Sequence, residues 1–349
     1  MSPHRVEGHD AFGRHGPATS VSVPDMPHIL VTGGAGYIGS HTVRALLAAG
    51  HRVSVLDDLS AGHRETVTDD VGFHQVDLAE EGPTRDAIDD SRPDAVIHFA
   101  GAIEAGMSMT DPARFYRVNV LGTFHLLEAL RLGGNPPVVY SSSAAVYGDP
   151  ESTPIREDAP KQPTNVYGRT KLDTEGMFAS YAGAYGLRST ALRYFNAAGA
   201  SSDAKLGEAH KHETHLIPLA IAAATSGTPM TLFGTDYDTP DGTCIRDYVH
   251  VEDLADAHIR AVDALLNGAP GDVYNVGVGS GFSNRDVLAA VERVVGKPLE
   301  IKEEARRAGD PAELVADSRR IAAALGWSPR YTDLGEIVGT AAAWHARRR

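Results

Sequence analysis

The stretch Gly33-Gly34-Ala35-Gly36-Tyr37-Ile38-Gly39 has three glycines in the spacing Gly-x-x-Gly-x-x-Gly. The apolar run Ile29 to Val31 precedes it and is typical of a buried parallel strand. The segment from Tyr37 to Ala49 has helical spacing and ends before Gly50, a common residue after a helix C-terminus. Glycines between a strand and a helix allow a tight turn and let backbone N–H groups approach a pyrophosphate. The stretch therefore predicts a dinucleotide site, with an incidental glycine-rich turn as the alternative.

Strand and helix patterns continue to alternate after this motif. Strand patterns occupy residues 52–58, 72–76, 95–99, 137–141 and 187–194, and helical patterns occupy 83–90, 111–133 and 165–185. This alternation predicts an α/β fold with a doubly wound parallel Rossmann sheet. Beyond residue 197 the pattern loosens, and we expect a smaller α/β substrate-binding domain there. A strand is also expected at 272–276, but periodicity does not say which sheet it joins.

Composition excludes several classes of function. The formal net charge of −14 argues against general binding to nucleic acid or anionic membrane surfaces, which carry the same sign. No apolar stretch reaches the roughly 18 residues that a transmembrane helix needs. Cys244 is the single cysteine, so an intrachain disulfide is impossible and a cytoplasmic location is expected. Residues 1–26 are polar, and we expect a disordered, dispensable tail with Met26 as the native start.

Acidic and small residues follow the predicted strands, where a nucleotide would lie. Asp57 ends the second strand and can accept the adenosine ribose hydroxyls, which favours NAD over NADP; Asp58 can take this role instead. Asp77 and Leu78 follow the third strand and suit the adenine. Phe99-Ala100-Gly101 ends the fourth strand and leaves room for a cofactor near the backbone, although a loop that is small for packing reasons is the alternative.

Tyr167 and Lys171 are four residues apart and share one face of a predicted helix. A phenol has an ordinary pKa near about 10, and a nearby ammonium lowers that pKa, so the pair can act as a general acid or base. Ser141 and Ser143 end the preceding strand, at the edge where ligands bind in such sheets. Without this context, a tyrosine and a lysine at this spacing are usually surface residues.

These motifs together resemble the UDP-glucose 4-epimerase family of extended short-chain dehydrogenases/reductases. The resemblance covers about residues 27–345 and also rests on Leu192-Arg193-Tyr194-Phe195-Asn196, on Asp241-Gly242-Thr243-Cys244-Ile245-Arg246-Asp247-Tyr248-Val249-His250 and on Arg306-Arg307-Ala308-Gly309-Asp310. It implies interconversion of UDP-galactose and UDP-glucose through a 4-keto intermediate with bound NAD, and a homodimer. It also implies an NAD-binding domain at 27–196 plus about 247–276, and a nucleotide-sugar-binding domain at 197–246 plus 277–345.

The resemblance implies roles for individual residues. The implied catalytic residues are Ser143, Tyr167 and Lys171. The implied NAD contacts are Gly33, Gly36, Tyr37, Ile38, Gly39, Asp57, Asp58, Asp77, Leu78, Phe99, Ala100, Gly101, Asn119, Ser141, Tyr167, Lys171 and Tyr194. The implied substrate contacts are Ser143, Phe195, Asn196, His215, Leu216, Phe233, Arg246, Tyr248, Arg307 and Asp310. Arginine forks at two of these positions suit a diphosphate.

Several alternatives stay open. His215 stands where the family commonly has Asn, and Leu314 stands at the position that limits the size of the sugar, so an epimerase of UDP-N-acetylglucosamine or a UDP-pentose is possible. A 4,6-dehydratase or a decarboxylase is disfavoured, because Ala144 and Ala145 stand where the dehydratases carry an acid. A non-catalytic NAD or nucleotide-sugar sensor is the alternative from another class, although such a protein is expected to lose Tyr167 or Lys171.

Three histidines, His210, His212 and His215, lie close together in a predicted loop. Their spacing lacks a cysteine or a helical frame, which makes it weak as a metal-binding pattern. We therefore expect no metal site and interpret the segment as a solvated loop.

Overall fold

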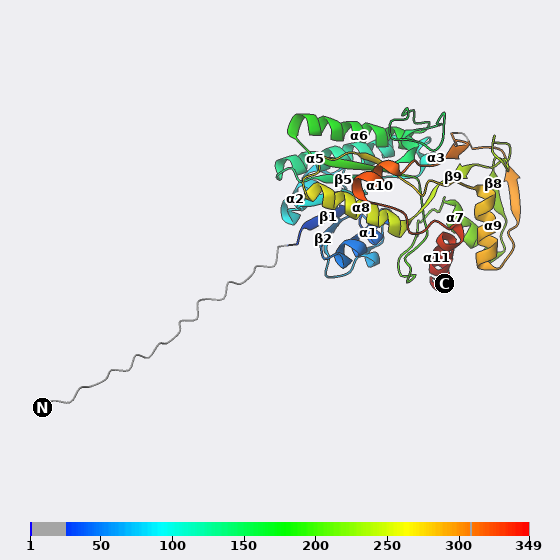
Figure 1. The fold of residues 1–349 in the computed structure, drawn as a ribbon, viewed down its shortest axis with the longest axis horizontal. Coiled ribbons are helices and arrows are strands. Elements are labelled where there is room, and N and C mark those ends of the chain that lie inside the picture. The colour runs from blue at the N-terminus through cyan, green and yellow to red at the C-terminus, as the bar shows by residue number, and fades with distance from the viewer. Residues whose placement is uncertain (2–25, 308, 349) are drawn as a thin grey trace.

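The computed structural model describes Met1 and residues 26–307 and 309–348, so the predicted tail at 1–25 lies outside the described residues except for Met1. A seven-stranded sheet forms the centre, in the order β11-β6-β5-β4-β1-β2-β3 (Figure 1). Its strands are β1 (His28–Thr32), β2 (Arg52–Leu56), β3 (Gly72–His74), β4 (Ala95–His98), β5 (Val138–Ser143), β6 (Ser189–Tyr194) and β11 (Val273–Val276). Every pairing in this sheet is parallel. The predicted fold class is confirmed, and the strand near 272–276 joins the main sheet beside β6.

Helices cover both faces of the sheet, because alternate residues of each strand point to opposite sides. Ile29 and Val31 of β1 share one core with α1 (Tyr37–Ala48) and α8 (Val251–Leu266). Leu30, between them, belongs to a second core with α2 (Glu81–Ser91), α5 (Gly122–Leu132) and α6 (Val166–Tyr185). Burial on both faces accounts for the continuous apolar run that predicted β1.

The predicted helix at 111–133 consists of three segments in the structure. They are α4 (Pro112–Phe115), a π-helical turn at Tyr116–Leu121 and α5. Asp111 caps the start, where its carboxylate accepts a hydrogen bond from the N–H of Arg114 at 3.3 Å. A π-helical turn often marks a functional site, and this one contains the buried Asn119.

A second, smaller unit has its own apolar core, built on α7 (Leu216–Ser226), α9 (Asn284–Val295) and α11 (Leu334–Arg347). These helices lie at the right-hand end of Figure 1, beside β8 (Met230–Phe233) and its parallel partner β13 (Ile301–Glu304). Two further small sheets pair β7 (Asn196–Ala198) with β10 (Tyr248–His250), and β9 (Ile245–Arg246) with β12 (Phe282–Ser283) and β14 (Glu313–Leu314). The short helices are α3 (Ala105–Ser108), α10 (Arg319–Leu325), η1 (Arg64–Thr66) and η3 (Ala144–Val146).

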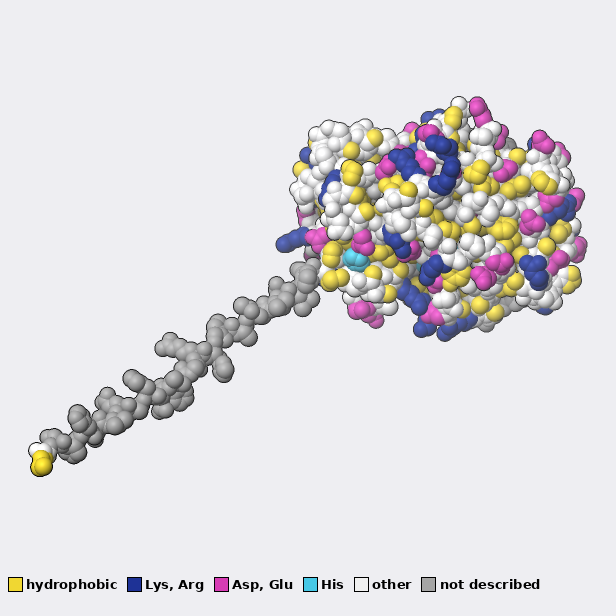
Figure 2. Space-filling view, viewed as in Figure 1, with side chains coloured by type: hydrophobic (Ala, Val, Ile, Leu, Met, Phe, Trp, Pro, Cys, Tyr) yellow, Lys and Arg dark blue, Asp and Glu magenta, His cyan; other side chains and the backbone are white. Residues whose placement is uncertain are grey.

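The surface has no single charge character on the face shown in Figure 2, where acidic and basic side chains are interspersed with apolar ones. Among the described residues, no helix has the length and apolar character that a membrane span requires.

Candidate active site

A cavity of about 670 Å³ opens at the carboxyl ends of the central strands and is lined by residues of both units. This is the edge at which doubly wound sheets bind ligands, and the volume suits a nucleotide-sized molecule. The predicted residues in its wall are Gly33, Gly36, Tyr37, Ile38, Gly39, Asp57, Asp58, Asp77, Leu78, Phe99, Ala100, Gly101, Ser143, Tyr167, Tyr194, Phe195, Asn196, His215, Leu216, Arg246, Tyr248 and Asp310. The structure therefore brings most of the predicted site together.

The glycine turn forms one end of this cavity. A Cβ atom on Gly33, which has a φ of +70°, would lie 2.6 Å from the Ala100 nitrogen, and one on Gly39 would lie 2.1 Å from the Gly33 oxygen. Both positions therefore require glycine, since β4 and α1 approach the turn so closely. Gly36 precedes α1, and no side chain caps that helix terminus. The first N–H groups of α1 and the positive end of its dipole are thus available to an anion.

The two acids after β2 have different environments. Asp57 is buried, and its carboxylate accepts hydrogen bonds from the N–H groups of Ala35 and Leu59, both at 2.9 Å. Burial raises the pKa of Asp57, while these two backbone donors lower it. Asp58 is exposed and accepts a hydrogen bond from the Ser60 N–H at 2.8 Å. Asp57 therefore holds the glycine turn in place, and both acids face the cavity.

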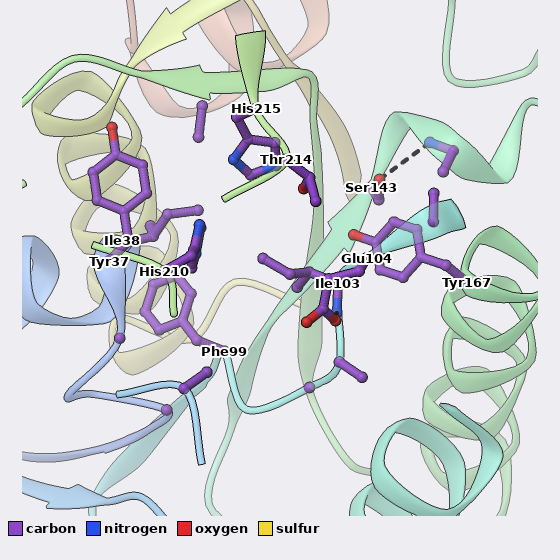
Figure 3. Close-up of a pocket in the computed structure, with 18 of the residues that line it drawn as sticks. Tyr37, Ile38, Phe99, Ile103, Glu104, Ser143, Tyr167, His210, Thr214 and His215 are labelled. Atoms are coloured by element: carbon purple, nitrogen blue, oxygen red, sulfur yellow. Dashed lines mark hydrogen bonds between the residues drawn. The ribbon is translucent and has the colours of Figure 1, made fainter. Parts of the chain in front are cut away.

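The side chains of Ser143 and Tyr167 lie next to each other in the cavity wall (Figure 3). Asn165 caps α6, accepting a hydrogen bond from the Gly168 N–H at 2.8 Å. A Cβ on Gly168 would lie 2.4 Å from the Ala145 oxygen, so the start of α6 packs directly on the loop after β5. This packing fixes the phenol, which is only 9% exposed, next to the Ser143 hydroxyl. Burial raises the pKa of Tyr167, and the hydrogen bond with Ser143 lowers it.

Lys171 is placed differently from the expectation. Its ammonium donates a hydrogen bond to the Ser141 carbonyl at 2.7 Å and lies 5.9 Å from the centre of the Tyr167 ring. Burial lowers the pKa of Lys171 to about 8. In this arrangement the hydrogen bond with Ser143 lowers the pKa of Tyr167, and the expected effect of Lys171 on that pKa stays a prediction. Lys171 lies behind the wall and connects α6 to β5.

Comparison with known proteins identifies the family. The model of the NAD dependent epimerase/dehydratase family matches residues 29–277. This chain belongs to the NAD-dependent epimerase/dehydratase family. A UDP-glucose 4-epimerase of Rhizobium meliloti (strain 1021) is 47% identical over 92% of this chain and 98% of its own length. A UDP-glucose 4-epimerase of Azospirillum brasilense is 48% identical over 91% of this chain and 92% of its own length.

A solved structure agrees with this membership. The crystal structure of UDP-glucose 4-epimerase from Brucella ovis in complex with NAD superposes with a TM-score of 0.87 and 47% identity, covering 90% of this chain and 97% of that one. The residues of this chain fit the cofactor of the family. A Cβ on Gly36 would meet only the Gly33 oxygen, at 3.3 Å, near the uncapped start of α1, and the acids after β2 line the same cavity.

Four implied residues of this NAD-dependent epimerase/dehydratase family member lie outside the cavity wall, in addition to Lys171. Asn119 is buried behind the wall, where it accepts a hydrogen bond from the Ala102 N–H at 2.7 Å. The Ser141 hydroxyl is hydrogen-bonded to His258 at 2.9 Å. The Arg307 guanidinium stacks on the Phe233 ring at 5.2 Å, and its Nε donates to Asp310 at 3.0 Å. Arg307 and Phe233 are held together by this stacking, so neither faces the cavity in this arrangement.

Further wall residues were not predicted from the sequence, since they lie in loops, in short segments or at the ends of helices and strands, where periodicity does not mark a ligand site. They are Leu56, Ser60, Ala61, Gly62, Val76, Ala102, Glu104, Ala105, Arg114, Arg117, Val118, Gly148, Thr164, Asn165, Ala197, Ala198, Glu208, Thr214, Ile217, Pro218, Gly309 and Pro311. Leu314, which the sequence linked to sugar size, lies in the wall. Two of these positions require glycine, because a Cβ on Gly62 would lie 2.8 Å from an Asp57 carboxylate oxygen and one on Gly148 would lie 1.9 Å from the Gln162 oxygen.

The histidines of the loop before α7 are not three independent solvated side chains. His210 and His215 share a cluster with Glu208 and Glu213, whereas His212 lies outside it. This corrects the interpretation of the segment as a solvated loop. The prediction from the sequence rested on the three histidines alone and did not include Glu208 and Glu213, which bring His210 and His215 together.

Proposed function

We propose that this chain is a UDP-glucose 4-epimerase, which interconverts UDP-galactose and UDP-glucose through a 4-keto intermediate with bound NAD. The observation that carries the proposal is the buried pair of Ser143 and Tyr167 in the wall of a cavity whose other end is the glycine turn. A phenol and a nucleotide cradle on one cavity suit removal of a proton from an alcohol beside a dinucleotide.

The residues of this chain supply the proton transfer and the positioning. Tyr167, as phenolate, removes the proton from the C4 hydroxyl of the sugar and returns a proton to the C4 oxygen after the sugar has turned over. The Ser143 hydroxyl donates its hydrogen bond to the Tyr167 oxygen, which stabilises the phenolate and holds it in place beside the C4 oxygen. NAD, when bound, accepts a hydride from C4 and returns it to the opposite face. No net oxidation results, so the enzyme is an isomerase.

We assign the nucleotide part of the substrate to the smaller unit. Arg246 is half-buried in the cavity wall near Tyr248 and Leu216, and its guanidinium suits the diphosphate. His215 precedes α7, whose free N-terminal N–H groups suit the same anion. Residues 27–196 plus about 247–276 bind NAD in this proposal, and 197–246 plus 277–345 bind the UDP-sugar. Arg307 is assigned to the diphosphate as well and Asp310 to the uridine ribose, which requires the Arg307 guanidinium to turn from Phe233 into the cavity.

We also propose that two copies of this chain form a homodimer through one face of α5 and α6. A hollow on this surface is lined by Tyr116, Val120, Leu121, Phe124, Asp173, Gly176, Met177, Ser180 and Tyr181. Phe124 in this hollow is 44% exposed, and Tyr116 and Leu121 are also exposed. A contiguous apolar patch of this kind marks an interaction surface.

Parallel incubation with UDP-galactose and UDP-N-acetylgalactosamine tests the proposed reaction, with the 4-epimers separated by chromatography. We expect UDP-glucose from the first substrate. Turnover of the second substrate alone supports the alternative that this chain is an epimerase of N-acetylated UDP-sugars, which Leu314 leaves open. Firm NAD binding without turnover of any UDP-sugar contradicts the proposal and supports a sensor.

A further inference from the structure

A cluster of four side chains with metal-ligand chemistry lies beside the cavity, and Figure 3 shows two of them, His210 and His215, across from Tyr167. Glu208, His210, Glu213 and His215 each offer one ligand atom, and these four atoms all lie within 4.8 Å of one another. All four residues belong to one short stretch of loop before α7. Neither the glycine turn nor the Ser143–Tyr167 pair uses this cluster, and of its members only His215 is also placed beside the proposed diphosphate site.

The four ligand atoms of the cluster lie close enough together to surround one small cation. His210 Nδ1 lies 3.2 Å from Glu208 Oε1 and 3.5 Å from Glu213 Oε2. His215 Nδ1 contacts Glu208 Oε1 and lies 3.8 Å from Glu213 Oε1. Zinc binds nitrogen and oxygen at about 2.0–2.2 Å in a tetrahedron, which separates neighbouring ligand atoms by roughly 3.3–3.5 Å.

The charges of the cluster also suit a divalent cation. Two carboxylates and two neutral imidazoles carry a charge of −2, which a divalent ion balances. This balance matters because Glu208 is only 5% exposed, and a buried charge requires a partner. Both histidine rings face Glu208, and their centres lie 5.4 Å apart.

The surrounding contacts orient the ligands, as is usual at metal sites. Glu213 Oε1 accepts hydrogen bonds from the N–H groups of Thr214 and His215 at 2.8 and 2.9 Å, which leaves Oε2 directed at His210. The backbone oxygen of Glu208 accepts a hydrogen bond from the Trp344 indole at 3.1 Å. These contacts hold both acids and leave Glu208 Oε1 and Glu213 Oε2 directed at the histidines.

We propose that Glu208, His210, Glu213 and His215 bind one divalent transition-metal ion, for which Zn²⁺ is the best fit. Imidazole and carboxylate together suit zinc, and four protein ligands make a closed, structural site. The ion orders the loop that precedes α7 and thereby fixes the cavity wall formed by His210, Thr214 and His215. The site is distinct from the proposed hydride and proton chemistry, which needs no metal.

The loop is also joined to the cofactor end of the cavity. The His63 ring contacts the Ala209 oxygen at 2.8 Å, and its backbone N–H donates to the Ala35 oxygen in the glycine turn at 3.0 Å. Ala209 lies between two of the proposed ligands. An ion that orders the loop therefore also supports the contact between the loop and the glycine turn.

Metal content of the full-length, untagged protein tests the proposal. The protein is passed into metal-free buffer after addition of equimolar Zn²⁺, and its metals are measured by inductively coupled plasma mass spectrometry. We expect one zinc per chain in the wild type and little in His210→Ala and Glu213→Gln. His212→Ala is the matched control, because His212 lies in the same loop and cavity wall but outside the cluster, and it should retain the zinc. Another divalent transition metal with the same pattern across the variants supports the site and replaces zinc as its occupant.

Equal zinc contents in the wild type, His212→Ala and His210→Ala, or none in any of them, would overturn the proposal. Circular dichroism and bound NAD show whether each variant is folded. If either His210→Ala or Glu213→Gln does not fold, the other variant carries the test. A chelator should lower the melting temperature of the wild type and of His212→Ala but not that of His210→Ala. If the chelator leaves the melting temperature of the zinc-loaded wild type unchanged, the ion does not order the loop before α7. None of these readouts depends on turnover, so their failure is separable from failure of the proposed epimerase activity.

Discussion

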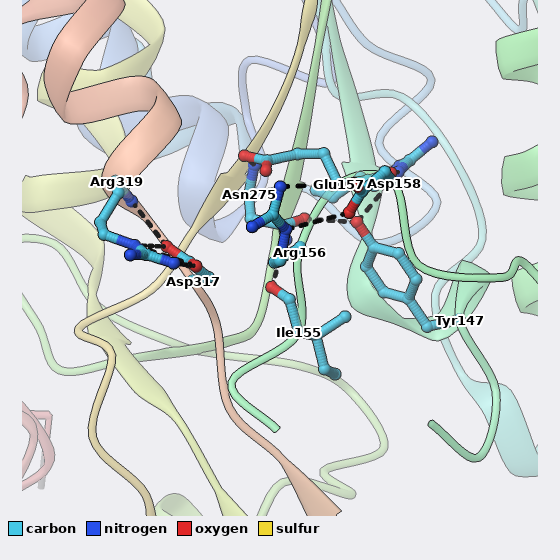
Figure 4. Close-up of polar contacts among 9 residues, drawn as sticks. Tyr147, Ile155, Arg156, Glu157, Asp158, Asn275, Asp317 and Arg319 are labelled. Carbon is cyan, nitrogen blue, oxygen red and sulfur yellow. Dashed lines mark hydrogen bonds and ion pairs between the residues drawn. The ribbon is translucent and has the colours of Figure 1, made fainter. Parts of the chain in front are cut away.

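The Tyr147 hydroxyl donates a hydrogen bond to the Asn275 side-chain oxygen at 2.6 Å, across 128 residues of chain (Figure 4). Tyr147 follows the active-site strand β5, and Asn275 lies in β11 at the edge of the sheet. The Asn275 amide also donates to the Ile155 oxygen at 2.8 Å. This one buried side chain therefore fixes the loop that connects Ser143 to α6.

Replacement of Asn275 by Ala should destabilise the protein. The change leaves the Tyr147 hydroxyl and the Ile155 carbonyl without this partner in a buried place, and we expect a loss of about 2–4 kcal/mol in the free energy of unfolding. Urea unfolding measures the loss. A double-mutant cycle with Tyr147→Phe isolates the shared hydrogen bond, and additive effects of the two substitutions would contradict a direct coupling.

Tyr167→Phe should nearly abolish epimerisation, because it removes the acidic hydroxyl and keeps the buried ring. A loss of at least about a hundredfold in kcat is expected for a general acid or base. NAD content, measured on the denatured protein, should stay at the wild-type level. Tyr185→Phe is the control, since Tyr185 is exposed on the same helix, and it should retain full activity. Retention of more than a few per cent of wild-type turnover by Tyr167→Phe would refute the role of the phenol.

Gly36→Ala should weaken NAD binding while the fold persists. Gly36 has φ −79° and ψ −179°, which alanine adopts freely, and the new Cβ would lie 3.3 Å from the Gly33 oxygen. The methyl group occupies the space in which the pyrophosphate approaches the start of α1, so the purified protein should contain less NAD. Gly183→Ala on α6, where a Cβ meets nothing within 4 Å, is the control. Equal NAD contents in the two variants would place the pyrophosphate elsewhere.

Lys171 should make stability depend on pH in the alkaline range. Burial lowers its pKa from 10.5 to about 8, so between these values the unfolded chain binds a proton that the folded chain has released. The contribution of Lys171 to the free energy of unfolding therefore rises with pH from about 8 to 10.5 and does not change with pH below about 8. Urea unfolding at several pH values compares the wild type with Lys171→Met. The wild type should gain stability relative to the variant as pH rises from about 8, and parallel curves would exclude a depressed pKa.

The sequence predicted the parts of the fold that depend on local patterns. The strand at Ile29–Val31 was visible because it is buried on both faces, and the turn at Gly33 was visible because backbone approaches of 2.6 Å leave no room for a side chain. Tyr167 was found through its spacing from Lys171. Lys171 bonds a strand carbonyl that no spacing along the helix could indicate.

The parts that were missed depend on contacts between distant segments or on the shape of a loop. Tyr147 and Asn275 are far apart in sequence and carry no motif. The stacking of Arg307 on Phe233 depends on how the loop after β13 meets the end of β8. The cluster around His210 forms because the loop curves, so that Glu208 and Glu213 approach the same point, and curvature of a loop leaves no period in the sequence.

Phe124→Lys should separate the proposed homodimer into monomers. The substitution places a charge at the centre of the apolar hollow on α5 and α6, where association would bury it without a partner. Leu132→Lys is the matched control, because Leu132 is 59% exposed on the same helix and lies outside the hollow. Size-exclusion chromatography with light scattering should give a dimer mass for the wild type and for Leu132→Lys, and a monomer mass for Phe124→Lys. If the wild type is monomeric, or if Phe124→Lys remains dimeric, two copies do not associate through this face.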